Sequence, residues 1–422
     1  MKRNGLVLSM VSLGHTGIHF YAMAFTIILA VIKDEFGLSF SQAGLILTVV
    51  TTVGFIVNMP SGAIADVLGR KRLQMGIALL APSIGYFIVS FAPTYTFVLL
   101  TIGLVGFGGA LWHPPAMSAL SDRFPGRRGF ALSWHEFGAN LGDFLGPAVT
   151  GIILATMLWR QMLSMYVLPG VALAILVWLV VPDIRQERKR VMLFEDYGRA
   201  LAGLFKNPRL IQVSSLSALR TMGQQALSFF LPLYLFSTLG LGPAVTGIYT
   251  SMLTFPAMFA GPVMGTLSDR LGRKPVLVAG MAASAVLSTL LGFFQPLVEV
   301  SSFSSSGLGG TLLGILAAFG GADVFLICLI ILGLFLFSMR PIIFAYAMDV
   351  TPKELGATTV GFVFSTNQIL SALSPFVAGL IADWAGPRFA FLFVGALITC
   401  GCIVAALLPR PLPPKESLWG AR

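Results

Sequence analysis

Charged residues and cysteines are both scarce in this sequence. Only 10% of its 422 residues are charged and 56% are hydrophobic, whereas a soluble globular protein carries about 25% charged residues. Because so few charges cannot cover a surface that faces water, a soluble protein is excluded and lipid is the expected environment. The three cysteines, Cys328, Cys400 and Cys402, all lie inside apolar runs. Their spacing indicates neither a metal site nor a disulfide framework.

Several motifs of enzymes are also missing. The sequence has no Gly-x-Ser-x-Gly and no Gly-x-x-x-x-Gly-Lys-Ser/Thr, which removes an α/β-hydrolase nucleophile and direct ATP drive by this chain. His135 and Glu136 begin the zinc-protease pattern His-Glu-x-x-His, but the last position is Ala139. We therefore expect no enzyme, no metal and no cofactor, and a proton gradient as the energy source.

Apolar runs of about 20 residues, the length that crosses a bilayer as a helix, recur through the chain. The basic start at Lys2 and Arg3 resembles a signal peptide, but the first run continues too far for one, so we interpret it as a retained helix. The runs lie near 6–32, 41–64, 73–91, 96–118, 129–157, 161–181, 211–237, 244–267, 275–298, 323–349, 356–382 and 387–409. The sequence thus predicts an all-α integral membrane protein with 12 transmembrane helices. They divide into an N-terminal bundle (1–181), a polar cytoplasmic linker (182–210) and a C-terminal bundle (211–422). The stretch 299–322 is interpreted as a loop at the membrane surface.

The positions of Lys and Arg predict the orientation, because these residues favour the cytoplasmic side. With both termini inside, only Lys33, Arg160 and Arg388 fall in outer loops. The net charge of +10 is therefore a topology signal, and we expect no nucleic-acid partner. The expected protein is a monomer in the bilayer of a bacterial inner membrane, with a small-molecule substrate.

A charged turn occurs twice, at 62–72 and at 265–275. In it Gly62, Asp66, Gly69 and Arg70 correspond to Gly265, Asp269, Gly272 and Arg273. A repeat offset by about half the chain indicates two equivalent halves. Twelve spans in two sixes, with Gly-x-x-x-Asp-x-x-Gly-Arg-Lys after the second span of each, resemble the major facilitator superfamily. The resemblance implies the pseudo-symmetric major facilitator fold, with two six-helix bundles around a central cavity that opens alternately to each side.

The doubled turn is predicted to be a cytoplasmic gate. Asp66 can attract the amino end of the span that begins near 351–354, and Asp269 the start of the span near 127–129. Such contacts exist only when the cytoplasmic side is closed. In the alternative interpretation these residues only set the topology. The predicted gate residues are Gly62, Asp66, Gly69, Arg70, Asp269, Gly272 and Arg273.

The fifth span contains small residues at every fourth position, namely Gly138, Gly142 and Gly146, followed by Pro147. This spacing predicts close packing against another helix, with a bend at the proline. The span resembles the glycine-rich fifth helix of facilitator antiporters, from which Ser133 and Thr150 depart. Together with His113-Pro114 it also resembles the fosmidomycin-resistance group of exporters.

Ionisable residues within spans are the strongest functional signal, because a charge at the bilayer centre costs about 2.5–3.5 kcal/mol. In the family that the sequence resembles, the first, fourth, seventh and tenth spans line the cavity. The two arginines suit an anionic group, although Arg340 could instead pair with Asp349 or Glu136. The predicted substrate-binding residues are His15, His19, His113, Arg220, Gln224 and Arg340.

Glu136, Asp143 and His135 are the predicted proton-coupling residues, since carboxyl and imidazole groups can bind and release a proton within the pathway. A buried hydrogen bond to a neighbouring helix is the alternative for either acid. The sequence therefore predicts a secondary active transporter, with proton-coupled antiport (efflux) of a small anionic or amphiphilic compound as the leading interpretation. Uptake or exchange of an organic anion, and passive facilitation, are the alternatives.

Overall fold

The computed structural model describes residues 2–68, 70–124, 126–182, 204–294, 323–351 and 356–409, and its regular elements there are all helices. The predicted linker (182–210) lies mostly, and the predicted surface loop (299–322) wholly, outside the described residues. The N-terminal half contains α1 (Lys2–Glu35), α2 (Phe40–Leu68), α3 (Lys71–Val89), α4 (Tyr95–Thr101), α5 (Gly103–Arg123), α6 (Arg128–Leu154), α7 (Trp159–Met165) and α8 (Val167–Val180).

The C-terminal half has the corresponding series of helices. It contains α10 (Pro208–Leu233), the short π-helix η1 (Tyr234–Thr238), α11 (Pro243–Thr254), α12 (Ala257–Leu271), α13 (Arg273–Leu290), α15 (Val324–Asp349), α16 (Gly356–Ser371), α17 (Ser374–Ala385) and α18 (Arg388–Leu407). Local sequence sets several starts. Asn207 caps α10 and is followed by Pro208 at the first turn, and Asp323 caps α15 by accepting from the Leu326 backbone N–H.

Nine helical segments among the described residues are long and apolar enough to cross a membrane. Each coincides with a span expected from the sequence. The other three expected spans correspond to α10 with η1, α11 with α12, and α13, all in the C-terminal half. Of these, α10 carries polar residues such as Arg220 and Gln224, and α11 and α12 are 12 and 15 residues long. The all-α membrane fold is confirmed.

Helices pack in the same order within each half. In the first half α1 lies against α6, α5 against α2 and α3, and α8 against α3. In the second, α10 lies against α16, α15 against α11, α12 and α13, and α18 against α13. The same order of helix packing in both halves agrees with a sequence motif that occurs once in each half.

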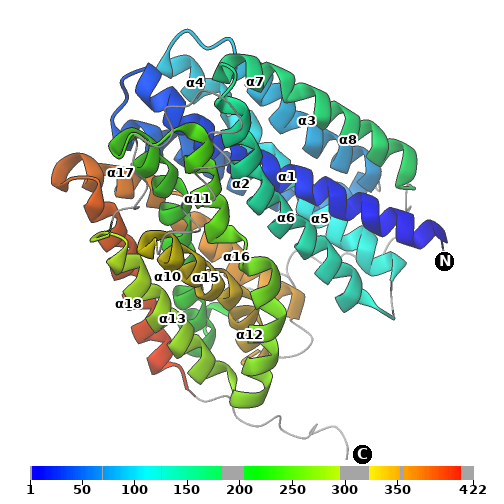
Figure 1. The fold of residues 1–422 in the computed structure, drawn as a ribbon. Coiled ribbons are helices and arrows are strands. Elements are labelled where there is room, and N and C mark those ends of the chain that lie inside the picture. The colour runs from blue at the N-terminus through cyan, green and yellow to red at the C-terminus, as the bar shows by residue number, and fades with distance from the viewer. Residues whose placement is uncertain are drawn as a thin grey trace, which may run out of the picture.

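The two halves touch closely at one end of the molecule, opposite the described ends of the chain (Figure 1). There α6 packs on α11 and α2 packs on α17. A Cβ atom on Gly247 would lie 2.2 Å from the Pro147 carbonyl oxygen, and one on Gly44 would lie 2.5 Å from that of Pro375. The Asp383 carboxylate also accepts from the Phe40 backbone N–H at 2.8 Å. We call this region the closed end.

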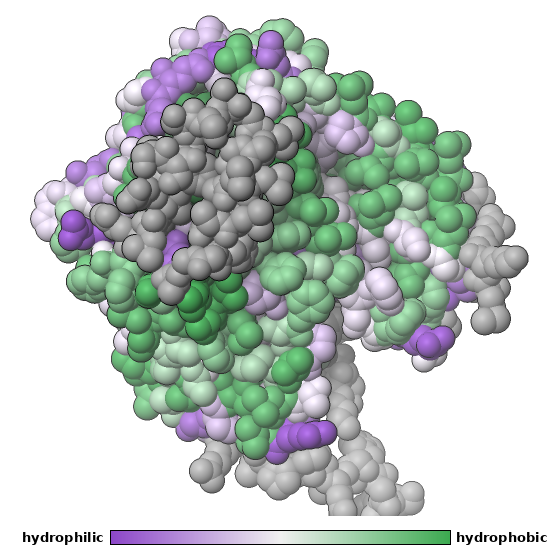
Figure 2. All heavy atoms as spheres, in the orientation of Figure 1, coloured by the Kyte–Doolittle hydropathy of each residue, from purple (hydrophilic) through white to green (hydrophobic). Residues whose placement is uncertain are grey.

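At the other end the halves diverge. Figure 2 shows the surface hollowed between the two lobes on the side where the described chain ends lie, while green, apolar side chains cover much of the flanks of both lobes. The two halves therefore touch at the closed end and leave a cleft between them at the other end. This is the geometry in which a cavity between the halves communicates with one side only.

Candidate functional site

A cavity of about 260 Å³ lies between the two halves, next to the closed end. Its wall combines apolar side chains with a few polar groups, the usual composition of a small-molecule site. The polar lining residues are His19 and Thr26 of α1, Thr51 and Asn58 of α2, His113 of α5, Gln225 and Ser228 of α10, and Gln368 of α16. Because both halves contribute, any movement of one half against the other changes the shape of this cavity.

All four histidines of the chain gather beside this cavity. His15 and His19 lie one turn apart on α1, where they share a face, and meet His113 of α5 and His135 of α6. The His15 and His135 rings stack with centroids 3.7 Å apart. The Nε2 atoms of His15 and His113 are 3.2 Å apart. The sequence predicted on which membrane span each histidine lies. The structure shows in addition that their rings are in contact.

Each histidine ring is held by a second contact. The Nδ1 atom of His15 lies 2.7 Å from the His135 carbonyl oxygen, and that of His113 lies 2.6 Å from the Gly109 carbonyl oxygen. Trp112 donates its indole N–H to Nε2 of His135 at 3.2 Å. The rings are therefore fixed in orientation by backbone and tryptophan, as in a preorganised site.

Asp143, a predicted proton-coupling residue, lies within this cluster. Its Oδ1 atom is 2.8 Å from Nδ1 of His19. The two side chains are 15% and 21% exposed respectively, so the pair is only partly open to solvent. Asp143 therefore orients the ring of His19, which lines the cavity.

Glu136 and Arg340 form an ion pair between the halves. Nη2 of Arg340 on α15 lies 3.4 Å from Oε1 of Glu136 on α6, and the side chains are 32% and 51% exposed. Glu136 is also near enough to interact electrostatically with His19, His113 and His135. Of the two partners for Arg340 considered from the sequence, the structure shows Glu136. The pair joins a predicted substrate-binding residue, Arg340, to a predicted proton-coupling residue, Glu136, across the space between the two halves.

Arg220 and Gln224 lie deeper in the C-terminal half. Arg220 is buried and donates from Nη1 to the Gln224 side-chain oxygen at 2.7 Å and to the Leu336 carbonyl at 2.9 Å. Its Nε atom has no hydrogen-bond partner. The cavity wall contains the next residue of the chain, Gln225. Substrate contact by Arg220 and Gln224 remains a prediction.

Sequence reasoning did not select several residues that the structure places at the site. Asn58, Gln225 and Ser228 line the cavity, and Trp112 holds His135. The signal for Asn58 was present, since it is an isolated amide within an apolar run. Gln225 directly follows Gln224, and only the rotation of α10 about its axis decides which of the two faces the cavity.

The glycines of α6 lie against the backbone of α1. Cβ atoms added to Gly138, Gly142 and Gly146 would lie 2.3, 2.3 and 2.8 Å from the carbonyl oxygens of residues 12, 16 and 20 respectively. Only hydrogen fits at these positions, so α1 and α6 approach closely along three turns. This contact fixes the spacing between the histidines of α1 and the acids of α6.

The predicted gate residues that the structure describes lie at the open end. Gly272 has φ +93°, a conformation that favours glycine. It separates α12 from Arg273, which pairs with Asp269 and, at 3.4 Å, with Asp349 of α15. Gly62 lies within α2 and Arg70 is exposed just before α3. Gly69 and the side chain of Asp66 fall outside what the structure describes. The proposed gate contacts between halves remain a prediction.

In the other half Lys71 makes the corresponding contact. Its buried Nζ donates to Ser118 Oγ at 2.7 Å and to Asp122 Oδ2 at 2.9 Å. In each half a basic residue of the doubled turn thus binds an aspartate at the end of the fourth span. These contacts stabilise each half by itself.

Comparison with known proteins decides the family. The model of the Major Facilitator Superfamily matches residues 11–301 and 213–422. The chain belongs to this superfamily. As a facilitator it is a multi-pass membrane transporter, which agrees with the absence of enzyme motifs in its sequence.

Three curated relatives show which facilitators the chain is similar to. It is 24% identical over 382 residues to the fosmidomycin resistance protein of Escherichia coli, covering 89% of this chain and 86% of the relative. It is 25% identical over 408 residues to the uncharacterized transporter YfnC of Bacillus subtilis, covering 92% and 88%. The match to the probable nitrate/nitrite antiporter NarK1 of Thermus thermophilus is 29% over 261 residues, and covers 58% of this chain and 57% of that protein. The resemblance to fosmidomycin-resistance exporters is thereby confirmed.

Solved structures agree on the facilitator fold. A bacterial homologue of the human lysosomal transporter Spinster superposes with a TM-score of 0.77 at 16% identity, covering 96% of this chain and 97% of the other. The nucleoside transporter NupG superposes with a TM-score of 0.74 at 13% identity, covering 96% and 99%. At such low identity the similarity concerns the fold alone.

Proposed function

We propose that this facilitator is a secondary active transporter that moves a small organic anion together with a proton. The observation that carries the proposal is the ion pair between Glu136 and Arg340, which bridges the two halves at 3.4 Å. Arg340 is the cation of this pair and is partly exposed. An anion that binds it must first replace Glu136.

Protonation of Glu136 couples the binding of a proton to the binding of the anion. It removes the negative charge that holds Arg340 and leaves the guanidinium free for an anionic substrate. Proton and anion therefore favour one another's binding, and by linkage the effect is reciprocal. The groups that act on Glu136 are Arg340, His19, His135 and His113. Arg340 is the permanent cation among these groups, which further favours a negative substrate.

Cooperative binding supports co-transport rather than antiport. In antiport the proton and the substrate compete for one site, so binding of either one displaces the other. At the Glu136–Arg340 pair the proton opens the site for the anion. The geometry thus favours the uptake alternative over the efflux that the sequence placed first. The name of NarK1, a probable nitrate/nitrite antiporter, agrees with an anionic substrate and describes exchange of one anion for another.

The movement would be a rocking of the two halves about the cavity. The closed end is held by close glycine packing and by Asp383, which binds the amino end of α2 across the halves at 2.8 and 2.9 Å. These contacts join residues of different halves, so they can separate without disturbing the packing within either half. Closure at the other end by the doubled turn would then give the second state.

Binding tests the coupling directly. Purified protein is titrated with acetate, lactate, gluconate, methylphosphonate and nitrate at pH 6 and at pH 8. We expect the best ligand to bind more tightly at pH 6, with Kd changing by up to about tenfold per pH unit for one linked proton. Glu136→Gln should remove this pH dependence, Arg340→Gln should remove the binding, and Arg388→Gln, which changes an exposed arginine of the same half, should alter neither.

Transport in liposomes tests the direction. Protein is reconstituted with a pH-sensitive dye inside, and the best ligand is added outside. Co-transport acidifies the interior, whereas antiport makes it alkaline. Alkalinisation, or a pH-independent Kd in the wild type, would overturn the proposed coupling. Binding of uncharged compounds with no anion bound would overturn the substrate class.

A further inference from the structure

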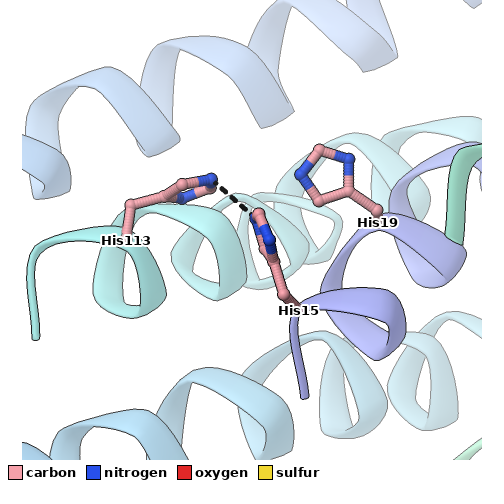
Figure 3. Close-up of side chains that lie close together, drawn as sticks. All are labelled: His15, His19 and His113. Carbon is pink, nitrogen blue, oxygen red and sulfur yellow. Dashed lines mark hydrogen bonds between the residues drawn. The ribbon is translucent and has the colours of Figure 1, made fainter. Parts of the chain in front are cut away.

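Three imidazole rings converge on one point in the cavity wall. His15 and His19 come from α1 and His113 from α5, and Figure 3 shows their rings turned toward one another. One nitrogen from each ring lies within 4.8 Å of those of the other two. His15 is buried, whereas His19 and His113 line the cavity.

The partners of the three Nδ1 atoms decide where the protons are. His15 and His113 face the carbonyl oxygens of His135 and Gly109, at 2.7 and 2.6 Å. His19 faces a carboxylate oxygen of Asp143 at 2.8 Å. Carbonyl and carboxylate oxygens only accept, so each Nδ1 carries the hydrogen. In each neutral ring the lone pair is then on Nε2.

Two of these lone pairs lie directly opposite one another. The Nε2 atoms of His15 and His113 are 3.2 Å apart, and if both rings are neutral with their hydrogens on Nδ1, two lone pairs face each other there. Such an arrangement requires a positive charge at its centre. Tetrahedral Zn²⁺ with metal–nitrogen distances of about 2.0–2.1 Å holds its ligand nitrogens about 3.3 Å apart. The spacing of His15 and His113 matches this value.

The contacts behind the rings are those of a metal site. A ligating histidine usually donates its other N–H to a carboxylate or a backbone carbonyl, which fixes its tautomer and orientation. All three rings do so here. His135 supports the arrangement from behind, since its ring stacks on that of His15 and its own Nε2 accepts from Trp112.

We propose that His15, His19 and His113 form a binding site for a divalent transition-metal ion of the Zn²⁺ class, with its fourth coordination position open to the cavity. Three imidazoles select Zn²⁺, Co²⁺, Ni²⁺ or Cu²⁺ over Mg²⁺ and Ca²⁺, which prefer oxygen ligands. His19 completes the set by moving inward by up to about 1.5 Å from the 4.8 Å limit to the tetrahedral spacing. The open position faces the space that a substrate would occupy. The site does not depend on the proposed anion transport.

The test uses the whole chain purified with a tag that contains no histidine and then stripped with a chelator. Zn²⁺ is added, unbound metal is removed by gel filtration, and bound metal is counted by mass spectrometry. Co²⁺ is titrated in parallel, because tetrahedral cobalt has an intense visible absorption. We expect one Zn²⁺ per chain, a tetrahedral Co²⁺ spectrum that Zn²⁺ displaces, and no retention of Mg²⁺.

Substitutions locate the ligands. His113→Gln and His19→Gln should each weaken Zn²⁺ binding more than tenfold, and Asp143→Asn should weaken it by about 10- to 100-fold because the carboxylate orients the ring of His19. His113→Cys, which keeps a metal-binding side chain, should retain the ion and shows that position 113 can be changed without loss of folding. Cys400→Ser is the control, since it removes an exposed thiol of the other half that could bind metal adventitiously, and it should keep one ion per chain.

Two results would overturn the site. One is a wild-type protein that retains no Zn²⁺ or Co²⁺, in which case a proton shared between His15 and His113 supplies the charge. The other is a His113→Gln protein, monodisperse on gel filtration, that binds Zn²⁺ as tightly as the wild type. The anion-binding and dye assays are unaffected by either result, so failure of the metal site and failure of the proposed transport are distinguishable.

Discussion

Gly247 allows the closed end to form, and replacing it with alanine should open that end. An added Cβ would lie 2.2 Å from the Pro147 carbonyl oxygen and 3.1 Å from the Gly151 Cα. Ordinary carbon–oxygen contacts are about 3.3 Å, so α11 and α6 would have to separate by about 1 Å. Overpacking of this kind costs about 1–3 kcal/mol. Since the contact exists only between the halves, the cost falls on this arrangement and not on either half.

The expected result is a shift of the conformational equilibrium. A cost of about 1–3 kcal/mol changes the ratio of the closed-end state to its alternative by about 5- to 150-fold. Electron–electron distance measurements between spin labels at Thr156 and Thr238, in a chain whose cysteines are replaced by serine, report on this ratio. Gly247→Ala should add a population at longer distance, while the thermal unfolding temperature stays close to that of the parent.

Two comparisons sharpen the experiment. Gly261→Ala is the matched control, because a Cβ there meets nothing within 4 Å, and it should leave the distances unchanged. Gly142→Ala places its Cβ 2.3 Å from the Thr16 carbonyl within the first half, so it should lower the unfolding temperature. If Gly247→Ala leaves the distance distribution unchanged, or destabilises the protein as Gly142→Ala does, the assignment of this glycine to the moving contact is refuted.

Three further changes test contacts of the two ends. Asp383→Ala removes the cap on the amino end of α2 at Phe40 and should weaken the closed end by about 0.5–2 kcal/mol, seen as longer label distances. Lys71→Met removes the buried ammonium that binds Asp122 at 2.9 Å and should lower stability by about 1–3 kcal/mol in thermal unfolding. Gly272→Ala forces a side chain onto φ +93° and should cost about 1–3 kcal/mol in the same assay.

Each of these has its own counter-result. Unchanged label distances in Asp383→Ala would show that the cap does not hold the halves together. Lys206→Met, at an exposed lysine, is the control for Lys71→Met, and equal unfolding temperatures for the two would contradict a structural role of Lys71. A Gly272→Ala protein as stable as the wild type would mean that the turn relaxes without strain.

Much of the architecture could be predicted from the sequence because lipid imposes simple rules. A helix must be about 20 residues long and apolar to cross the bilayer, so the spans could be counted directly. Three spans of the C-terminal half satisfy this rule less clearly. For example, α10 contains polar residues, and one span is divided into the shorter helices α11 and α12. The doubled turn places two of these spans, because it lies between the second and third span of each half.

The candidate site could be predicted only in part. The histidines were identified as buried ionisable groups, but the sequence places His113 far from His15 and gives no register between α1 and α5. The choice between Gln224 and Gln225 shows the limit clearly. Successive residues on a helix point about 100° apart, and the rotation of α10 is set by its packing on α15, α16 and α18.

By itself the sequence determined the solvent, the number of spans, the two equivalent halves and the ionisable residues within them. These properties depend on composition and on the cost of placing charge in hydrocarbon, which act on each segment separately. Only the tertiary structure decided that Glu136 faces Arg340, that three imidazoles share one centre, and which end of the molecule is closed. Such contacts join side chains that are far apart in the chain, and their distances depend on how closely α1 and α6 pack through Gly138, Gly142 and Gly146.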